Sequence, residues 1–460
     1  MQSDNDVKGL DPVAPVSTRA KPLENHPAQH QKTLGRGDLT LFTVSAILLL
    51  DPLMSTAAMG VSSVFWWIFL GVLFFIPFGL ISAELGTTYP EQGGIYAWVR
   101  DAFGKRWGSR VIWAYWSNVA VWNPAMFILF AGMFSQIFYP ELPLHGQIII
   151  GIVLSWFCVW VNVLSLEVGK WVPNLGAISK IAIILALILG GSYYTARHGM
   201  ANPITTEHFI PSWDGSLRYV PAVIYGMLGF ELMSCGSEEI KDPARDLPWA
   251  IATSGLIIGG LYTLGTLGIL VAVPVGEIHL VEGLMKTFLV FFGSTGAGYA
   301  IALLLGVASL YTFFSSAVTW TLGTNRAMAE AAQEGEFPSF FAWEHPRYGT
   351  PVGAAVANGV VCTAVFLLYG FLAGSNEDLF WNLFAFSAAI YFFPYCMMML
   401  AFIKLRRVDG ARHRPFRFPG KSQMAMAAAA FCGLLLIFCM GLIFYVPGEG
   451  MQWPIFLGTA

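Results

Sequence analysis

The chain has 460 residues, 56% of them hydrophobic and only 12% charged, and its formal net charge is −3. A soluble domain has about 25% charged residues, so this composition excludes a soluble protein. It indicates an all-α polytopic membrane protein whose partner is the lipid bilayer. We expect no nucleic-acid partner, and a homodimer is compatible with the sequence.

Residues 1–38 are polar and contain no short apolar run with a cleavage site, which predicts a disordered cytoplasmic tail and no signal peptide. A transport core of ten spans is then expected over 39–404. A basic loop, an eleventh span and a short C-terminus follow over 405–460. Apolar windows of about 20 residues mark the spans. They lie at 39–62, 65–88, 109–138, 146–165, 172–193, 218–239, 248–273, 297–324, 351–373, 379–403 and 423–446.

The regions between and after these spans add four expectations. An amphipathic helix is predicted over 279–293, and a polar extension of the eighth span over 325–345. Most of the 25 lysines and arginines fall in the tail and in the even-numbered loops, which predicts a cytoplasmic N-terminus in the bacterial cytoplasmic membrane. The last ten residues are too short to cross, so a twelfth span is missing.

The six cysteines all lie in apolar segments, and none forms a C-x-x-C pair. We interpret them as buried free thiols and expect no metal and no cofactor. They are Cys158, Cys235, Cys362, Cys396, Cys432 and Cys439.

The sixth span is interrupted near its middle. Gly226 and Gly229 weaken the helix, since each interior glycine costs about 0.5–1 kcal/mol, and the ionisable Glu231 follows two residues later. This pattern predicts a broken helix whose loose backbone groups face a cavity. The alternative is a glycine-mediated packing face with a hydrogen-bonded structural glutamate.

The first span is interrupted as well, at Asp51, Pro52 and Ser55. Breaks five spans apart are typical of an inverted five-plus-five repeat that binds its substrate between the two broken helices. The alternative is that Asp51 and Pro52 begin a helix at the membrane surface.

Three ionisable residues are predicted at membrane depth: Asp51, Lys180 and Glu231. Such residues are usually functional or paired. Lys180 could neutralise a carboxylate or occupy the place of a coupling cation; alternatively it extends to the membrane edge. Tyr225 and Trp320 are aromatic residues that could cover a bound substrate.

Four motifs resemble those of the amino acid–polyamine–organocation transporters. They are PEQGGIYAW at 90–98, Gly229–Glu231 followed by DPARDLP at 242–248, GEFP at 335–338 and GTPV at 349–352. Within this family the chain looks most like the glutamate/γ-aminobutyrate antiporter branch, from PVGEI at 274–278 and GLMKTF at 283–288.

The resemblance implies a LeuT-like five-plus-five inverted repeat and sodium-independent amino-acid exchange. It implies that Glu231 is a proton-responsive group and that Lys180 replaces a sodium site. It also implies that Tyr225 and Trp320 match gating or covering aromatic residues, and that Asn123 matches a substrate-contacting asparagine. The G-S-G pattern of most relatives is missing from the first span, and the C-terminal plug of the antiporter branch is absent.

These inferences predict one mechanism, in which substrate lies between the two breaks. Free N–H groups near 54–56 and 228–230 bind its carboxylate, and carbonyl groups near 49–50 and 222–225 take its ammonium group. Glu231 and Lys180 are the predicted proton-coupling residues. The predicted substrate-binding residues are Asp51, Ser55, Ser117, Asn123, Tyr225, Gly226, Gly229, Phe230 and Trp320.

The predicted function is proton-responsive exchange or symport of amino acids or their decarboxylated amines. One alternative is a proton-coupled permease for polyamines or cationic amino acids, which Asp51 would suit. Another is a sensor that binds an amino acid without moving it. No enzyme is expected, because the sequence has no H-E-x-x-H motif and no nucleophile elbow. A channel would need polar lining along several helices.

Overall fold

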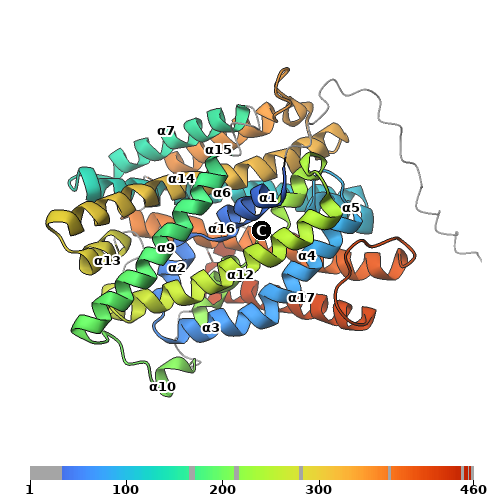
Figure 1. The fold of residues 1–460 in the computed structure, drawn as a ribbon. Helices are drawn as coiled ribbons and strands as arrows, with labels where there is room; N and C mark the ends of the chain where they lie inside the picture. The colour runs from blue at the N-terminus through green and yellow to red at the C-terminus, as the bar shows by residue number, and fades with distance from the viewer. Residues whose placement is uncertain are drawn as a thin grey trace, which may run out of the picture.

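The computed structural model describes residues 34–164, 171–211, 217–278, 283–370, 374–446, 450–453 and 455–456 (Figure 1). Its helices are α1 (Arg36–Ile47), α2 (Leu50–Ala57), α3 (Ser62–Leu70), α4 (Ile76–Thr88), α5 (Ile95–Phe103), α6 (Lys105–Phe138), α7 (Leu144–Val163), α9 (Trp171–His198), α10 (Thr206–Phe209), α11 (Val220–Tyr225), α12 (Pro243–Leu270), α13 (Gly283–Phe292), α14 (Gly296–Gln333), α15 (Val352–Tyr369), α16 (Asn376–Val408) and α17 (Ser422–Phe444). Two short strands, β1 (Tyr445–Val446) and β2 (Gly450–Met451), pair antiparallel after α17.

The predicted membrane segments coincide with these helices. Among the described residues, eight helices are long and apolar enough to cross a membrane, and the bent pair of α1 and α2 makes up to nine. The helix α15 is apolar but shorter. The sixth predicted segment is divided between α11 and the 3-10 helix η3 (Leu232–Glu239), while a π-helical turn, η1 (Gly71–Phe75), joins α3 to α4. Helices form because a chain in lipid must pair its backbone groups within each segment.

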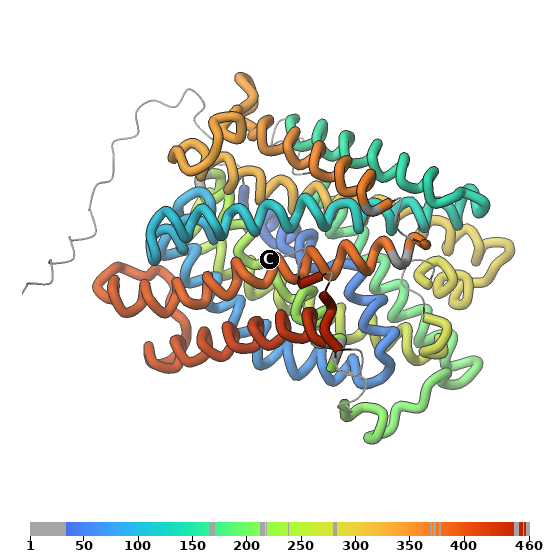
Figure 2. The backbone as a smooth tube through the Cα atoms, turned by 180° about the vertical axis from the view of Figure 1, so that it is seen from behind, coloured from blue at the N-terminus to red at the C-terminus, as the bar shows by residue number. Residues whose placement is uncertain are grey.

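The long helix α6 is the centre of the bundle. It packs against α5, α7, α14, α15 and α16, and its aromatic residues Tyr115, Trp116 and Trp122 are buried. The helices α7 and α15 lie together along one side of the bundle, whereas α3, α4 and α17 lie along the opposite side (Figures 1 and 2). The short helices α1 and α2 lie inside the bundle. Helix α1 packs against α9, α12 and α14, and α2 packs against α12.

Ion pairs gather at one end of the bundle, which we call the basic end. It holds the start of α1, the end of α4, helix α5, the start of α12 and the ends of α14 and α16. Among the pairs that join different elements there are Arg36 with Asp246 at 2.6 Å, Arg326 with Glu239 at 2.7 Å and Arg406 with Glu84 at 2.6 Å. The helices α10 and α13 lie at the opposite end (Figure 1).

The predicted tail boundary at residue 38 comes slightly too late. Residues 1–33 lie outside the described part, but α1 already begins at Arg36. The Leu34 N–H donates to Glu239 O at 3.1 Å, and the Lys241 N–H donates to Leu34 O at 3.1 Å. This backbone pairing with the chain after η3 fixes a segment whose composition is that of a tail.

The remaining elements follow the sequence closely. The amphipathic helix predicted over 279–293 is α13 from Gly283 onward, and residues 279–282 lie outside the described part. The polar extension of the eighth span, predicted over 325–345, ends earlier, at Gln333, before Gly335 with its φ of +79°. All six cysteines are free and buried, as predicted.

Candidate substrate site

The first membrane segment breaks at Leu48 and Leu49, where α1 and α2 meet at a bend of 42°. The Tyr262 hydroxyl of α12 occupies this break. It donates to Ile47 O at 2.6 Å and accepts from the Leu49 N–H at 2.8 Å. Backbone groups freed by a helix break must find partners in an apolar interior, so this hydroxyl stabilises the interruption.

Replacing Tyr262 with phenylalanine should therefore destabilise the break. The ring, which stacks on Trp67 with centroids 4.2 Å apart, would stay, but two buried backbone groups would lose their partner. An unsatisfied buried group costs about 1–3 kcal/mol, so we expect a lower melting temperature of the purified protein in detergent. Tyr193→Phe, at an exposed tyrosine, is the control; equal melting temperatures for both variants would contradict the role of the Tyr262 hydroxyl.

The sixth segment breaks after Tyr225. The helix α11 ends there, and η3 begins only at Leu232. Gly229 adopts a φ of +129°, which side chains rarely allow. A Cβ atom at Gly226 would lie 2.9 Å from the Pro52 Cβ, so the two broken segments touch at this glycine. The predicted break is confirmed, and close packing explains why it is built from glycine.

A small cavity lies at the meeting point of the two breaks. Trp320 on one wall is held by a 2.9 Å hydrogen bond from its Nε1 to Ala46 O, at the end of α1. The Tyr225 hydroxyl lies 3.2 Å from the Ser387 Oγ, which donates to Asn118 Oδ1 at 2.6 Å. The lining residues are Leu49, Asn118, Trp122, Tyr225, Leu228, Trp320 and Tyr391.

Glu231 is completely buried just beyond the second break. Its Oε1 accepts hydrogen bonds from the Tyr115 hydroxyl at 2.7 Å and the Tyr395 hydroxyl at 2.6 Å. Its Oε2 is buried and has no hydrogen-bond partner among the described residues. Tyr115 of α6 and Tyr395 of α16 thus hold the carboxyl group in place, while its Oε2 is available to accept a proton.

Asp51 and Lys180 are both buried beside the first break. Asp51 is in the first turn of α2, so the break comes two residues earlier than predicted, and residues 54–56 lie inside α2 with their N–H groups in the helix. The start of α2 lies inside the protein and not at the membrane surface, because Asp51 is only 4% exposed. The Lys180 Nζ donates to Ser45 O at 2.5 Å and so ties α9 to α1.

Seven of the nine predicted binding residues are not part of the cavity lining. Asp51, Gly226 and Gly229 lie at or beside the two breaks, and the other four make contacts elsewhere. Ser55 donates to Pro52 O at 3.2 Å within α2. Ser117 is half-buried on α6, and Asn123 donates to Thr321 Oγ1 at 2.9 Å and to Asn358 Oδ1 at 3.1 Å. Phe230 stacks on Phe75 of η1 with centroids 4.7 Å apart.

Sequence reasoning missed the residues next to two of these. Asn118 and Trp122 line the cavity, whereas their neighbours Ser117 and Asn123 do not. Successive helical residues are turned by about 100° around the axis. A predicted residue that is one position away from the correct one therefore lies on another face of the helix. Tyr391, also missed, lies four residues before Tyr395 in α16, and this spacing was a usable signal because it places two tyrosines on one helix face.

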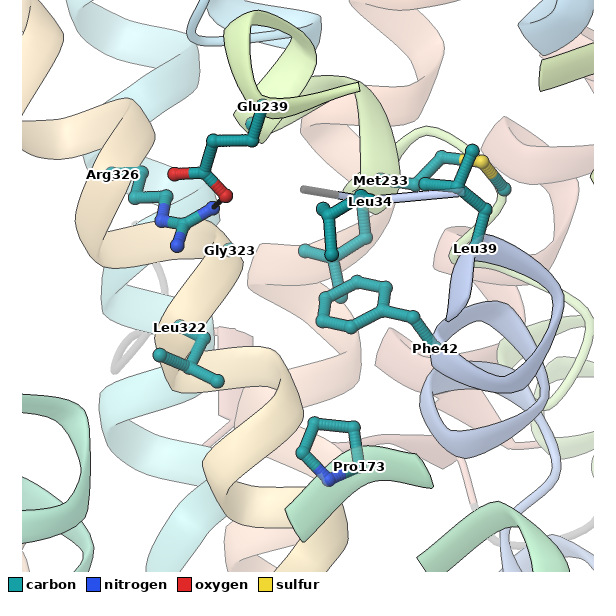
Figure 3. Close-up of a pocket in the computed structure, with 11 residues that line it drawn as sticks. Leu34, Leu39, Phe42, Pro173, Met233, Glu239, Leu322, Gly323 and Arg326 are labelled. Carbon is teal, nitrogen blue, oxygen red and sulfur yellow. Dashed lines mark hydrogen bonds and ion pairs between the residues drawn. The ribbon is translucent and has the colours of Figure 1, made fainter. Parts of the chain in front are cut away.

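A second and larger cavity lies at the basic end between α1, α9, α14 and η3 (Figure 3). Its walls are mostly apolar, with Leu39, Phe42 and Leu322 among them. The Arg326–Glu239 ion pair lies at one edge and joins α14 to the end of η3 (Figure 3). Both cavities thus lie between the two broken segments and α14.

A helical membrane bundle with two interrupted helices that meet at a central cavity defines a secondary transporter. The solved structure of MhsT in complex with L-phenylalanine has this fold. It matches with a TM-score of 0.58 at 15% identity, covering 90% of this chain and 99% of that chain. The inverted-repeat fold predicted from the sequence is therefore confirmed.

The chain belongs to the amino acid permease family, whose model matches residues 34–457. It is 32% identical to a probable agmatine/putrescine antiporter of Lactococcus lactis, over 86% of this chain and 84% of the relative. It is 22% identical to a glutamate/gamma-aminobutyrate antiporter of the same species, over 91% and 85%. A polyamine transporter of rice, PUT1, is 25% identical over 79% of this chain and 64% of the relative. The chain is thus a transporter embedded in a membrane.

Proposed function

We propose that the protein exchanges amino acids or their decarboxylated amines across the bacterial cytoplasmic membrane, without sodium and in response to protons. The observation that carries this proposal is Glu231, a buried carboxyl group just beyond the second break, one of whose oxygens has no hydrogen-bond partner in the part of the chain that the structure describes. The basic end would face the cytoplasm, because lysine and arginine concentrate on that side of membrane proteins. The named relatives, antiporters for agmatine/putrescine and for glutamate/gamma-aminobutyrate, support exchange.

The two breaks would give substrate its binding surface. Tyr225 and Trp320 line the cavity from α11 and α14, and freed backbone groups at each break can bind polar ends of a small molecule. Lys180 would supply the positive charge that a coupling cation supplies elsewhere, since its Nζ reaches the Ser45 carbonyl directly. Sodium would then have no role at this position.

Protonation of Glu231 would bias the two orientations of the carrier. Tyr115 of α6 and Tyr395 of α16 donate to its Oε1, and Tyr391 and Cys235 are the other titratable groups in its electrostatic surroundings. Losing or gaining a proton changes how tightly η3 is held to α6 and α16. At the basic end, the Arg326–Glu239 pair would separate when the cavity shown in Figure 3 opens.

Uptake into proteoliposomes tests the proposal. Vesicles preloaded with a mixture of unlabelled amino acids and amines receive labelled glutamate, γ-aminobutyrate, arginine, putrescine or a neutral amino acid at pH 5.5 and pH 7.5. An exchanger accumulates one class of label against its preload, with or without sodium. A sensor accumulates none while still gaining thermal stability from its ligand, and that result would contradict exchange.

Glu231→Gln should flatten the pH dependence of this uptake. Glutamine keeps the size and polarity of the side chain but cannot gain or lose a proton, so the variant should transport at similar rates at both pH values. The comparison is the ratio of initial rates at pH 5.5 and 7.5 in the wild type and the variant. Full transport with the wild-type ratio would show that another group carries the proton.

A further inference from the structure

We propose that Tyr395 couples the protonation of Glu231 to the binding of substrate, by directing its single hydroxyl proton either to the Glu231 carboxylate or to Tyr391 in the cavity wall. The inference rests on the proposed function and names the residues that connect its proton to its substrate. Tyr395 is a positioning residue in this scheme, because it acts through Tyr391 and is not itself part of the cavity lining.

The Tyr395 hydroxyl lies between two acceptors. It is 2.6 Å from the Glu231 Oε1 and 2.8 Å from the Tyr391 hydroxyl oxygen, and Tyr395 is the donor in both contacts. A hydroxyl group carries one proton, so Tyr395 can donate fully to only one of these acceptors at a time. The two tyrosines are four residues apart on one face of α16, with ring centroids 4.8 Å apart. Both side chains are buried, so bulk water does not compete for this proton.

Glu231 remains held when Tyr395 turns away from it. The Tyr115 hydroxyl of α6 donates to the same Oε1 at 2.7 Å. The Oε2 atom is buried and has no hydrogen-bond partner among the described residues, so it can take up a proton. The titratable groups around Glu231 are Tyr115, Tyr391, Tyr395 and Cys235. Tyrosine and cysteine side chains are ordinarily neutral at pH 7, so a change of charge in this group is a change at Glu231.

The charge of Glu231 decides between the two acceptors. A hydrogen bond to an ionised group is about twice as strong as one between neutral groups, so the carboxylate keeps the Tyr395 proton. Once Glu231 takes a proton from water at Oε2, its Oε1 becomes a neutral acceptor that Tyr115 already satisfies. The Tyr395 hydroxyl then turns to the Tyr391 oxygen and keeps its own proton throughout.

Tyr391 brings this change into the cavity. It lies in the lining with Tyr225 and Trp320, at centroid distances of 4.8 Å and 5.6 Å. None of the seven lining residues that the structure describes is charged, so a substrate ammonium group depends on neutral oxygens such as that of Tyr391. This oxygen is open while Glu231 is ionised and becomes a poorer acceptor once Tyr395 donates to it. Protonation of Glu231 should therefore weaken substrate binding, and substrate binding should by linkage release a proton.

Infrared difference spectroscopy tests the turning of Tyr395 without any substrate. Acidifying the purified protein should produce the carbonyl stretch of protonated Glu231, which Glu231→Gln identifies by removing it. A carbonyl group that accepts fewer hydrogen bonds absorbs at a higher frequency. Tyr391→Phe deletes the alternative acceptor, so Tyr395 should stay on Oε1 and the band should move to lower frequency. Tyr225→Phe is the matched control, because it removes a cavity hydroxyl that pairs with Ser387, and it should leave the band in place.

Tyr395→Phe provides the second arm of this test. It removes the donor, so adding Tyr391→Phe to it should no longer move the band. An unmoved band in Tyr391→Phe alone, or the same shift with and without the Tyr395 hydroxyl, would overturn the proposal while Glu231 still titrates. If Glu231→Gln removes no band, Glu231 takes up no proton, and the proton response of the proposed function fails together with the proposal.

Exchange kinetics test the link to substrate. Every label in the uptake assay carries an ammonium group, so KM is measured for whichever label the wild type exchanges, at pH values well below and well above the midpoint of the Glu231 band. The wild-type KM should be at least about fivefold higher at the acidic value, the lower end of ordinary coupling between two sites. This ratio should fall by more than half in Tyr391→Phe and in Tyr395→Phe, and Tyr225→Phe should keep it. A wild-type ratio in both variants would overturn the coupling, whereas no exchange of any label would refute the transport function and leave the infrared result to decide the role of Tyr395.

Discussion

Glu84→Ala is expected to lower the stability of the protein by about 3–5 kcal/mol, the cost of leaving a buried charge without its partner. Glu84 is fully buried at the end of α4. Its Oε1 accepts from the Arg406 Nε at 2.8 Å and from the Arg414 Nη1 at 3.2 Å. Its Oε2 accepts from the Arg406 Nη2 at 2.6 Å and from the Phe418 N–H at 2.7 Å. Alanine would remove the carboxylate partner of both arginines and leave the Phe418 N–H without its acceptor.

The substitution of Glu84 affects more than a single contact, because Arg414 and Phe418 belong to the loop between α16 and α17. Tyr89 holds this loop as well, since its hydroxyl donates to Asp409 Oδ2 at 3.0 Å. Burial, with the Asp409 charge in support, raises the pKa of Tyr89 to about 12, so the hydroxyl keeps its proton and remains a donor. The Glu84 carboxylate and the Tyr89 hydroxyl therefore fasten one loop to the end of α4.

Thermal unfolding in detergent measures this effect. Glu277→Ala removes a glutamate from the exposed turn η4 (Val275–Glu277) and should leave the melting temperature unchanged. Glu84→Ala should unfold well below both the wild type and this control. If Glu84→Ala and Glu277→Ala unfold at the same temperature, the arginines find other partners and the hydrogen bonds of Glu84 do not contribute to stability.

Gly229→Ala is expected to reduce exchange at least tenfold. The φ of +129° is available to glycine but strained for alanine, at a cost of about 1–3 kcal/mol. The added Cβ atom would also lie 3.0 Å from the Ile47 Cγ1 and 3.1 Å from the Trp320 Cζ2. The end of α1, the second break and the cavity wall meet at this point, so any relaxation would displace the binding surface itself.

Initial rates of exchange, normalised to the amount of protein in the vesicles, measure this loss. Gly260→Ala provides the same substitution in the exposed part of α12, where a Cβ atom would meet nothing within 4 Å. This control should transport like the wild type. A Gly229→Ala protein that exchanges at the control rate would show that the break tolerates ordinary backbone geometry.

Much of the fold followed from the sequence, because lipid forces each apolar segment into a helix and glycine or proline marks where a helix fails. The breaks near Asp51 and at Gly226–Gly229 were identified in this way. The position of the first break was two residues off, since Pro52 lacks a backbone N–H and is tolerated in the first turn of a helix. Proline alone therefore did not distinguish the interruption from the start of α2.

The site was recovered less completely. Tyr225 and Trp320 line the cavity as the family resemblance implied, whereas Asn118, Trp122 and Tyr391 were not found. Helical spacing identifies residues that share a face, but it does not tell which face of α6 or α16 is turned towards the breaks. That orientation depends on the packing of several helices at once.

The sequence by itself determined that the chain crosses the membrane many times, that two of its spans are interrupted and that buried ionisable groups lie at or near the interruptions. Composition, apolar length and helix-breaking residues are local properties, so they can be read along the chain. Only the tertiary structure decided that Tyr262 bridges the first break, and that Tyr115 and Tyr395 hold Glu231. These contacts join residues far apart in the chain, and only the packing of the helices brings them within hydrogen-bond distance.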